Sequence, residues 1–313
     1  MSDIHDLQSY LTALEAIGQL ARVRRSVSLI HELADVAATL ERSGGPAPLF
    51  EQPQSEAGFN WPVFSSGLAH SERVAVALGC SRAEIAAAMG RALEPANGIP
   101  PVEVAEAPWK KNVLRGDEVD IRRLPIPTHA AKDGGPFITG GVIVTCDPSN
   151  PARGNLSYNR MQVLGKHTFG MNINEWRDVR WFLNQVEPRH QPLPVAVAIG
   201  LDPVIMIAGG CKYDGDELAL AGALRGHPIP VTRGLTQDLC IPADAEIVIE
   251  GHIPPGVRCD EGPLAEFHGY YGELWNSPTF EVTAICFRDN PIFQTIIPGW
   301  SEHIFIGNVL PRE

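Results

Sequence analysis

A short acidic and aromatic segment, EGPLAEFHGYYGE, begins at Glu261 and carries groups that could transfer protons. Glu266 follows five residues later across a Gly-Pro step, and a histidine and two tyrosines come next. An apolar pocket raises the pKa of a carboxyl group, and a nearby arginine or second carboxylate separates the roles of a pair. Leu264, Ala265 and Phe267 would supply that pocket. Because acid-Gly-Pro turns are also common in inactive proteins, a proton-handling site and a buried turn both remain open.

A second polar cluster lies in the segment GNLSYNRMQ. If this segment is a strand, Asn155, Ser157 and Asn159 share one face. Tyr158 and Arg160 then share the other face. Polar groups on both faces are typical of a strand that lines a ligand, but an edge strand gives nearly the same pattern. Arg160 is the candidate cation for the first acid of EGPLAEFHGYYGE, provided that the fold brings the two together.

Two further segments place polar groups beside small residues. YDGDELALAGALRG puts Glu217 at the start of a small-residue helix, where the helix dipole favours a carboxylate with or without a function. THAAKDGGPFITGG puts His129, Asp133 and Thr139 around paired glycines, which let a cofactor approach the backbone closely.

The motifs GxxxxGK[ST], GxGxxG, HExxH and GxSxG are absent. A metal site built from Asn and Glu oxygens would prefer Mg²⁺ or Mn²⁺ to Zn²⁺.

Length and composition restrict the class of protein. A chain of 313 residues suggests two domains, and 44% hydrophobic with 20% charged residues is ordinary for a globular protein. The net charge of -12 argues against a nucleic-acid partner, because no excess of Lys and Arg exists to neutralise phosphates. No apolar run approaches the roughly 20 residues of a membrane span. The scattered cysteines and the acidic start without a signal peptide predict reduced thiols and a cytoplasmic location.

The elements that must position these groups change in type along the chain. Alternating helix and strand is predicted over residues 1–110. Helices are expected in DIHDLQSYLTALEAIGQL, with Leu7, Tyr10, Leu11, Leu14 and Ile17 on one face, in HELADVAATLERSGG, and in SRAEIAAAMGRAL, where Ser81 and Glu84 form a capping box. Short strands are expected in PLFEQP and WPVFSSGL.

The rest of the chain, residues 111–300, is predicted to form a β-barrel or sandwich with inserted helices. Strands are expected in FITGGVIVTCDP, PVAVAIGLDPVIMIAGG, AEIVIEGHI and FEVTAICFRDNPIFQTIIP, which are rich in β-branched residues. Helices are expected in DELALAGALRG and in NEWRDVRWFLNQV, with Trp176, Val179, Phe182 and Leu183 on one face.

Taken in order, these clusters resemble the UbiD-type (3-polyprenyl-4-hydroxybenzoate decarboxylase-like) family. The segments that carry the resemblance are DGGPFITGG, NLSYNRMQ, PVAVAIGLDP, DELALAGALRG, PADAEIVIEG and EGPLAEFHGYYG. The resemblance implies an α+β fold, with an N-terminal mixed α/β domain (1–110) and a flavin-reductase-like split β-barrel (111–300). It also implies that residues 301–313 begin a linker to an absent C-terminal α/β domain, which would leave the cofactor site open on one side.

Family membership implies a reaction and its cofactors. The expected activity is non-oxidative, reversible decarboxylation of an aromatic or α,β-unsaturated carboxylic acid, with CO₂ as the second product. The expected cofactors are prenylated FMN, Mn²⁺ (or Mg²⁺) and K⁺ (or Na⁺), and a flavin prenyltransferase would supply the modified flavin. A homo-oligomer or a partner subunit is expected, with no nucleic acid and no integral membrane segment.

The resemblance also assigns roles to residues. Glu266 would protonate the carbon left by departing CO₂, while Glu261 and Arg160 hold its proton and charge, and Arg160 could also bind the substrate carboxylate. The implied cofactor-binding residues are Thr139, Asn155, Ser157, Tyr158, Arg160, Gln162, Gly209, Gly210, Cys211 and Glu217. Asn155 and Glu217 would bind the metal. The family's third ligand is a histidine, and this sequence has Asp178 at that place, which we prefer to the nearby loop residue His167.

Two alternatives remain open from the sequence. A flavin-binding module without decarboxylation would need Asn155 and Glu217 but no second carboxylate. A non-catalytic subunit or fragment of a multi-subunit carboxylase would explain the abrupt end of the chain after NVLPRE.

Overall fold

The computed structural model describes residues 4–55, 58–266 and 268–310. Within them the helices are α1 (Leu7–Ala16), α2 (Glu32–Arg42), α3 (Ser71–Leu78), α4 (Ile85–Leu93), α5 (Asp178–Val186), α6 (Pro203–Gly210), α7 (Glu217–Arg225), α8 (Ser301–Ile304) and the π-helical turn η7 (Phe305–Val309). The strands are β1 (Leu20–Ser28), β2 (Ala47–Gln54), β3 (Val63–Phe64), β4 (Val102–Glu103), β5 (Asn112–Arg115), β6 (Phe137–Ile138), β7 (Val142–Asp147), β8 (Asn150–Tyr158), β9 (Met161–Val163), β10 (Thr168–Met171), β11 (Leu193–Ile199), β12 (Pro230–Arg233), β13 (Cys240–Pro242), β14 (Ile247–Ile253), β15 (Arg258–Glu261), β16 (Trp275–Phe287) and β17 (Phe293–Gln294).

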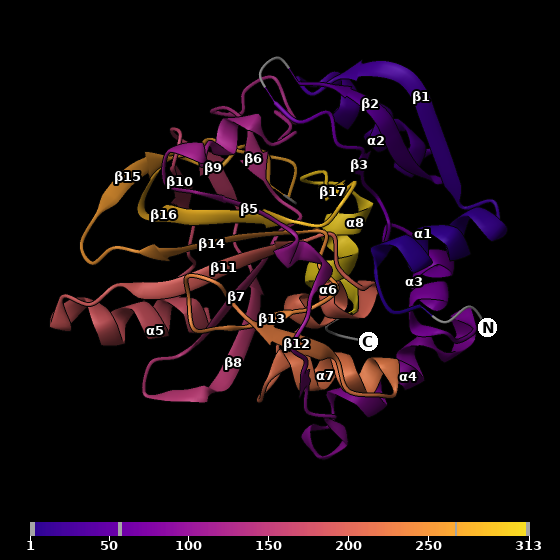
Figure 1. Cartoon of the computed structure of the whole chain (residues 1–313). Helices are drawn as coiled ribbons and strands as arrows, with labels where there is room; N and C mark the ends of the chain where they lie inside the picture. The colour runs from indigo at the N-terminus through magenta and orange to yellow at the C-terminus, as the bar shows by residue number, and fades with distance from the viewer. Residues whose placement is uncertain (1–3, 56–57, 267, 311–313) are drawn as a thin grey trace.

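A large antiparallel sheet forms the centre of the molecule. Its strand order is β6-β9-β10-β16-β14-β11-β7-β8, and β5 and β15 also pair with β16. A smaller sheet with the order β1-β2-β3-β17 belongs mainly to the N-terminal part, and β13-β12-β4 form a third sheet. Figure 1 shows α1, α3 and α4 beside the central sheet and α5 at its far end. The predicted class, a mixed α/β N-terminal part followed by a mainly β part, is confirmed.

Strand β11 shows why the central sheet is buried on both faces. Successive side chains of a strand point to opposite faces. Ala196 and Ala198 pack into the hydrophobic core that also holds α6 and α7. Val195 and Val197 pack into the second core, on the side of α5. The continuous apolar run of this strand therefore serves two cores.

The first predicted helix is confirmed except at its C-terminus. The Asp6 carboxylate accepts a hydrogen bond from Ser9 N at 2.8 Å and caps α1. Tyr10 and Leu14 are buried as predicted, but Ile17 is 47% exposed because the helix ends at Ala16. The capping box of Ser81 and Glu84 is present and precedes α4.

Two expectations for the central part are wrong. The segment PVIMIAGG is helix α6 and not a strand, because Pro203 occupies its first turn and the Asp202 side chain accepts from Val204 N at 3.0 Å. Trp176 does not share the apolar face of α5, since that helix begins at Asp178 and leaves Trp176 90% exposed. No helix in the described residues is long and apolar enough to cross a membrane.

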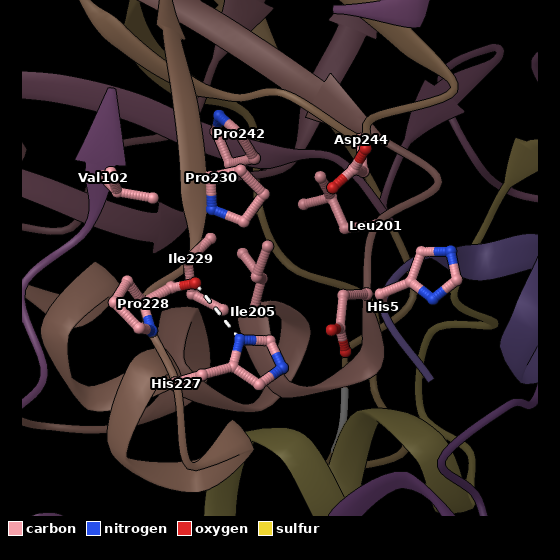
Figure 2. Close-up of a pocket in the computed structure, with 11 residues that line it drawn as sticks. His5, Val102, Leu201, Ile205, His227, Pro228, Ile229, Pro230, Pro242 and Asp244 are labelled. Atoms are coloured by element: carbon pink, nitrogen blue, oxygen red, sulfur yellow. Dashed lines mark hydrogen bonds between the residues drawn. The ribbon is translucent and has the colours of Figure 1, made fainter. Parts of the chain in front are cut away.

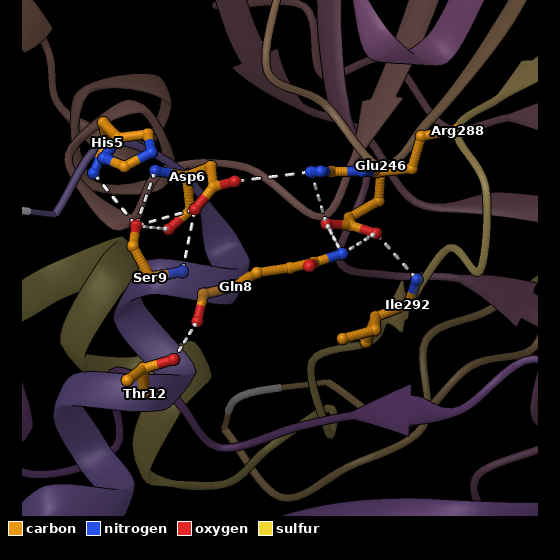
Figure 3. A network of polar contacts seen from close by, with 8 residues as sticks. All are labelled: His5, Asp6, Gln8, Ser9, Thr12, Glu246, Arg288 and Ile292. Atoms are coloured by element: carbon orange, nitrogen blue, oxygen red, sulfur yellow. Dashed lines mark hydrogen bonds and ion pairs between the residues drawn. The ribbon is translucent and has the colours of Figure 1, made fainter. Parts of the chain in front are cut away.

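Buried polar contacts join the N-terminal and central parts. Strand β17 pairs with β3, so a late segment of the chain completes the N-terminal sheet. Figure 3 shows the fully buried Glu246, which accepts hydrogen bonds from Gln8 Nε2 at 3.1 Å and Ile292 N at 2.9 Å. Arg288 bridges Asp6 and Glu246 at 3.3 and 3.2 Å. These contacts fix α1 against the turn between β16 and β17.

Candidate active site

Arg160, Glu261 and Glu266 meet in one charged cluster, which we call the trio. Arg160 lies in the short connection between β8 and β9, Glu261 ends β15, and Glu266 lies in the loop beyond it. The Arg160 guanidinium donates Nε to Glu261 Oε1 at 2.8 Å and Nη2 to Oε2 at 3.1 Å. Its Nη1 donates to Glu266 Oε1. The side chain of Glu261 is fully buried, whereas that of Glu266 is 26% exposed.

Neighbouring loops hold the trio through polar contacts that the sequence did not indicate. Asn172, just after β10, donates to Glu261 Oε2 at 3.0 Å. Gln162 donates to Gly134 O and accepts from Gly262 N, both at 2.8 Å. A Cβ on Gly134 would lie 2.2 Å from Gly262 O, so only glycine permits this approach. Gln162, predicted as a cofactor ligand, is therefore placed as a support for the trio loops and lines neither cavity described below.

The trio faces a cavity of about 260 Å³, the trio cavity. Arg160 and Glu266 line it, and Thr139 and Tyr158 lie in its wall as predicted cofactor neighbours. The apolar lining comes from Leu264, Ala265, Ile296, Pro298 and Ile306. Phe267, expected in the same pocket, lies outside the described residues. The Glu266 carboxyl group thus stands beside apolar walls that could enclose a flat ring.

Thr139 is held in place by a buried hydroxyl and imidazole cluster. Its Oγ1 donates to Ile296 O at 2.7 Å and lies 3.0 Å from Thr295 Oγ1. His129 Nε2 lies 3.0 Å from the same Thr295 hydroxyl. Burial lowers the pKa of His129 to about 3, so the imidazole is neutral at physiological pH. Asp133, from the same predicted cluster, accepts from Ala130 N at 2.7 Å and orders this loop instead.

A second cavity of about 830 Å³, the amide cavity, adjoins the first. Asn174, Arg177, Gly210 and Gly307 line both. Its lining also includes the predicted residues Asn155, Ser157, Asp178, Cys211 and Glu217. Gly210 must be glycine here, because a Cβ would lie 2.6 Å from Ile306 O. Gly209 lies below the surface, where a Cβ would contact Val142 at 3.3 Å.

The donor set of the amide cavity fits a divalent cation. Asn155 Nδ2 donates to Glu217 Oε1 at 3.3 Å, and Leu156 N donates to Glu217 Oε2 at 2.9 Å. Asn155 Oδ1 is buried without a hydrogen-bond partner in the described part of the chain. Burial raises the pKa of Glu217 to about 8, which a bound cation would counteract. An orphan amide oxygen beside a buried carboxylate is what Mg²⁺ or Mn²⁺ would satisfy.

The third predicted metal ligand is less well placed. Asp178 lines the amide cavity, but its Oδ2 pairs with Arg153 Nη2 at 3.3 Å. His167 lies in the turn between β9 and β10 and does not line the cavity. The described residues contain no group of three or more His, Cys, Asp or Glu side chains placed to hold a metal ion. A metal here would depend on the amide of Asn155.

Cys211 and Tyr158 are shielded neighbours of the two cavities. Burial raises the pKa of the Cys211 thiol to about 12, so it stays protonated. Tyr158 donates its hydroxyl to Met206 O of α6 at 3.0 Å. Ser157 lies in the amide cavity and donates to Asn159 Oδ1 at 3.1 Å. None of these groups is a reactive nucleophile, so they would shape and orient a ligand.

A separate hollow of about 250 Å³ is lined by none of the predicted site residues (Figure 2). Its floor is apolar, with Leu201, Ile205 and Ile229. Asp202 at its edge is paired with Arg225, and His227 Nδ1 lies 3.2 Å from Pro228 O. Asp202 and His227 thus have polar partners within the fold.

Comparison with known proteins shows the family of the chain. Residues 101–301 match the 3-octaprenyl-4-hydroxybenzoate carboxy-lyase Rift-related domain, and residues 11–93 match the N-terminal domain of the same carboxy-lyases. The chain resembles an evolved dimeric form of the UbiD-class enzyme HmfF from Pelotomaculum thermopropionicum in complex with prFMN, with a TM-score of 0.92 and 36% identity. That match covers 99% of this chain and 71% of the other.

Two decarboxylases are also similar. The 3,4-dihydroxybenzoic acid decarboxylase of Klebsiella pneumoniae has a TM-score of 0.91 and 29% identity, over 99% of this chain and 68% of the other. The vanillic acid decarboxylase of Sedimentibacter hydroxybenzoicus has a TM-score of 0.92 and 29% identity, over 98% and 68%. With both family domains matched over most of its length, the chain belongs to the UbiD family of carboxy-lyases.

Proposed function

We propose that the chain catalyses reversible, non-oxidative decarboxylation of an aromatic or α,β-unsaturated carboxylic acid at the trio, with prenylated FMN and a divalent metal. The observation that carries the proposal is the pairing of Arg160 with both Glu261 and Glu266, beside a cavity that adjoins the one lined by Asn155 and Glu217. The presence of prFMN in the related HmfF structure supports the choice of cofactor.

The trio would handle the proton of the reaction. Glu266 is the more exposed acid and reaches the cavity, so it would deliver a proton to the carbon that loses CO₂. Arg160 would stabilise the carboxylate that remains. Glu261, held by Arg160 and Asn172, would fix the guanidinium in position. Glu266 would thus carry the proton, whereas Glu261 would orient the guanidinium of Arg160.

The two cavities would divide the cofactor between them. The modified flavin supplies the electron sink that protein side chains lack. Asn155 and Glu217 would hold the metal that anchors its phosphate, while Thr139, Tyr158 and the apolar lining of the trio cavity would position its ring. The apolar residues would also exclude water from the reacting carbon.

Replacing the proposed acid tests this function. In protein loaded with prenylated FMN, Glu266→Gln should lower decarboxylation of a panel of aromatic and unsaturated acids by roughly 10²–10⁴-fold, because general-acid catalysis contributes that much. Glu273→Gln is the matched control, since Glu273 is an exposed acid of the same loop. CO₂ release and bound flavin would be measured together. Unchanged turnover in Glu266→Gln would remove this residue from the acid role.

A further inference from the structure

The trio by itself offers no net positive charge that would attract an anionic substrate into the trio cavity. When Glu266 holds the proton that it delivers, the single positive charge of Arg160 is balanced by Glu261, so the trio has no net positive charge. Three of the five N–H groups of Arg160 are already used in those contacts. The trio would then offer a substrate carboxylate no net electrostatic attraction. A second cation nearby would supply it.

Arg177 is the cation that the geometry offers. It is the N-cap residue of α5 and lines both the trio cavity and the amide cavity. Its side chain is exposed, and within the described residues it makes no ion pair and no side-chain hydrogen bond. The neighbouring Asn174 lines the same two cavities and Asn172 lines the trio cavity, which adds amide groups to this rim.

The other basic groups nearby are paired with an acid, neutral, or outside the lining of the trio cavity. Arg153 pairs with Asp178 and lies over the ring of Trp181. Lys212 lines the amide cavity but not the trio cavity. His303 lines the trio cavity, but burial lowers its pKa and its Nδ1 accepts from Gly299 N, so it is neutral. Within the described lining of the trio cavity, the uncompensated positive charge belongs to Arg177.

We propose that Arg177 binds the carboxylate of the incoming acid and selects acids over neutral analogues. This inference rests on the proposed function. The polar rim of Arg177, Asn172 and Asn174 would receive the charged group, while Leu264 and Ile296 on the apolar walls would receive the ring or double bond. The phosphate of the cofactor would be left to the amide cavity, where Lys212 and the Asn155–Glu217 pair lie.

Ligand pairs that differ only in charge test this assignment. Protein loaded with FMN would be titrated with benzoate, cinnamate, 3,4-dihydroxybenzoate and vanillate, and with the carboxamide of each, following flavin fluorescence. Arg177→Gln should weaken binding of the preferred acid at least about tenfold and leave its amide unchanged, because only the acid uses the charge. Arg177→Lys should recover part of the loss. Arg189→Gln removes an arginine beyond the other end of α5 and is the charge-matched control.

The affinities of wild type and Arg177→Gln for FMN and for riboflavin, which differ by the phosphate, would also be measured. Equal FMN affinity in wild type and Arg177→Gln supports the assignment. Weaker FMN binding with unchanged riboflavin binding and unchanged acid binding would place Arg177 on the phosphate and overturn it. A wild type that prefers no acid to its amide would overturn it as well. A wild type that binds no FMN would remove the proposed function itself, whereas FMN binding without any effect at Arg177 removes only this inference.

Discussion

At the scale of single residues, two pairs of polar side chains have members in different surroundings. One pair is Glu261 with Glu266, and the other is Asn155 with Glu217. Glu261 is fully buried and receives three hydrogen bonds from Arg160 and Asn172, whereas Glu266 receives one from the described residues and stays in contact with the cavity. In the amide cavity, Glu217 uses one oxygen for a backbone N–H, and Asn155 Oδ1 has no hydrogen-bond partner among the residues that the structure describes. The arrangement of Glu261 and Glu266 suits proton transfer, and that of Asn155 and Glu217 suits the binding of a hard cation.

The metal assignment gives a prediction at this scale. Glu217→Gln should lower the Mn²⁺ content of protein dialysed against the ion, because the substitution removes the charged oxygen of the donor set. Asp214→Asn is the matched control, since Asp214 is an exposed acid that lines the same cavity. Metal analysis by mass spectrometry would measure both. Equal occupancy in wild type and Glu217→Gln would contradict the ligand assignment.

At the scale of elements, capping signals and helical periodicity predicted α1, α2, α4 and α7 well, because those helices are amphipathic and have marked ends. Helix α6 was missed because every residue from Pro203 to Gly210 is buried, which leaves no polar face to reveal a period. The trio joins residues that are 101 and 106 positions apart. Only the family resemblance indicated their meeting, because no local pattern encodes such a distance.

The residues that sequence reasoning missed depend on strand pairing and loop placement. Asn172 reaches Glu261 because it follows β10, which lies between β9 and β16 in the sheet. Arg177 reaches both cavities because it precedes α5 directly. The segment GMNINEWRDV does contain both polar residues, but their direction is set by the sheet and not by their spacing.

The contact between α6 and η7 gives a prediction at the element scale. Gly210→Ala places a methyl group 2.6 Å from Ile306 O, so η7 must move away from α6. We expect a loss of about 1–3 kcal/mol in the free energy of unfolding, together with weaker FMN binding. Gly90→Ala is the control, because that position in α4 has open space and alanine favours the helix. Urea unfolding would measure both, and equal stability of the two variants would contradict the contact.

At the scale of the whole molecule, buried carboxylates join the N-terminal part to the rest. Glu246 receives Gln8 from α1, and Glu302 of α8 accepts from Ser66 N and Leu68 N at 2.8 Å. Burial raises the pKa of Glu246 to about 7 and that of Glu302 to about 8. The folded state therefore holds these protons more tightly than the unfolded state does.

This linkage predicts how stability depends on pH. The folded pKa of Glu246 lies above its ordinary value of 4.5, so its contribution is complete below pH 4.5 and is lost as the pH rises through about 7. Glu302 acts in the same direction up to about pH 8. Between pH 5.5 and 8.5, Glu246→Gln should remove on the order of 2 kcal/mol of this decline. Glu118→Gln, at an exposed site, is the control. An unchanged pH slope of the unfolding free energy in Glu246→Gln would refute the linkage.

A crystal structure of the chain with FMN and Mn²⁺ would show whether the trio cavity and the amide cavity form one cofactor site. We expect the flavin ring in the trio cavity, beside Tyr158 and Glu266, with the phosphate and the metal ion at Asn155 and Glu217. Flavin bound elsewhere, or a ring turned away from Glu266 with the metal ion on other residues, would contradict it.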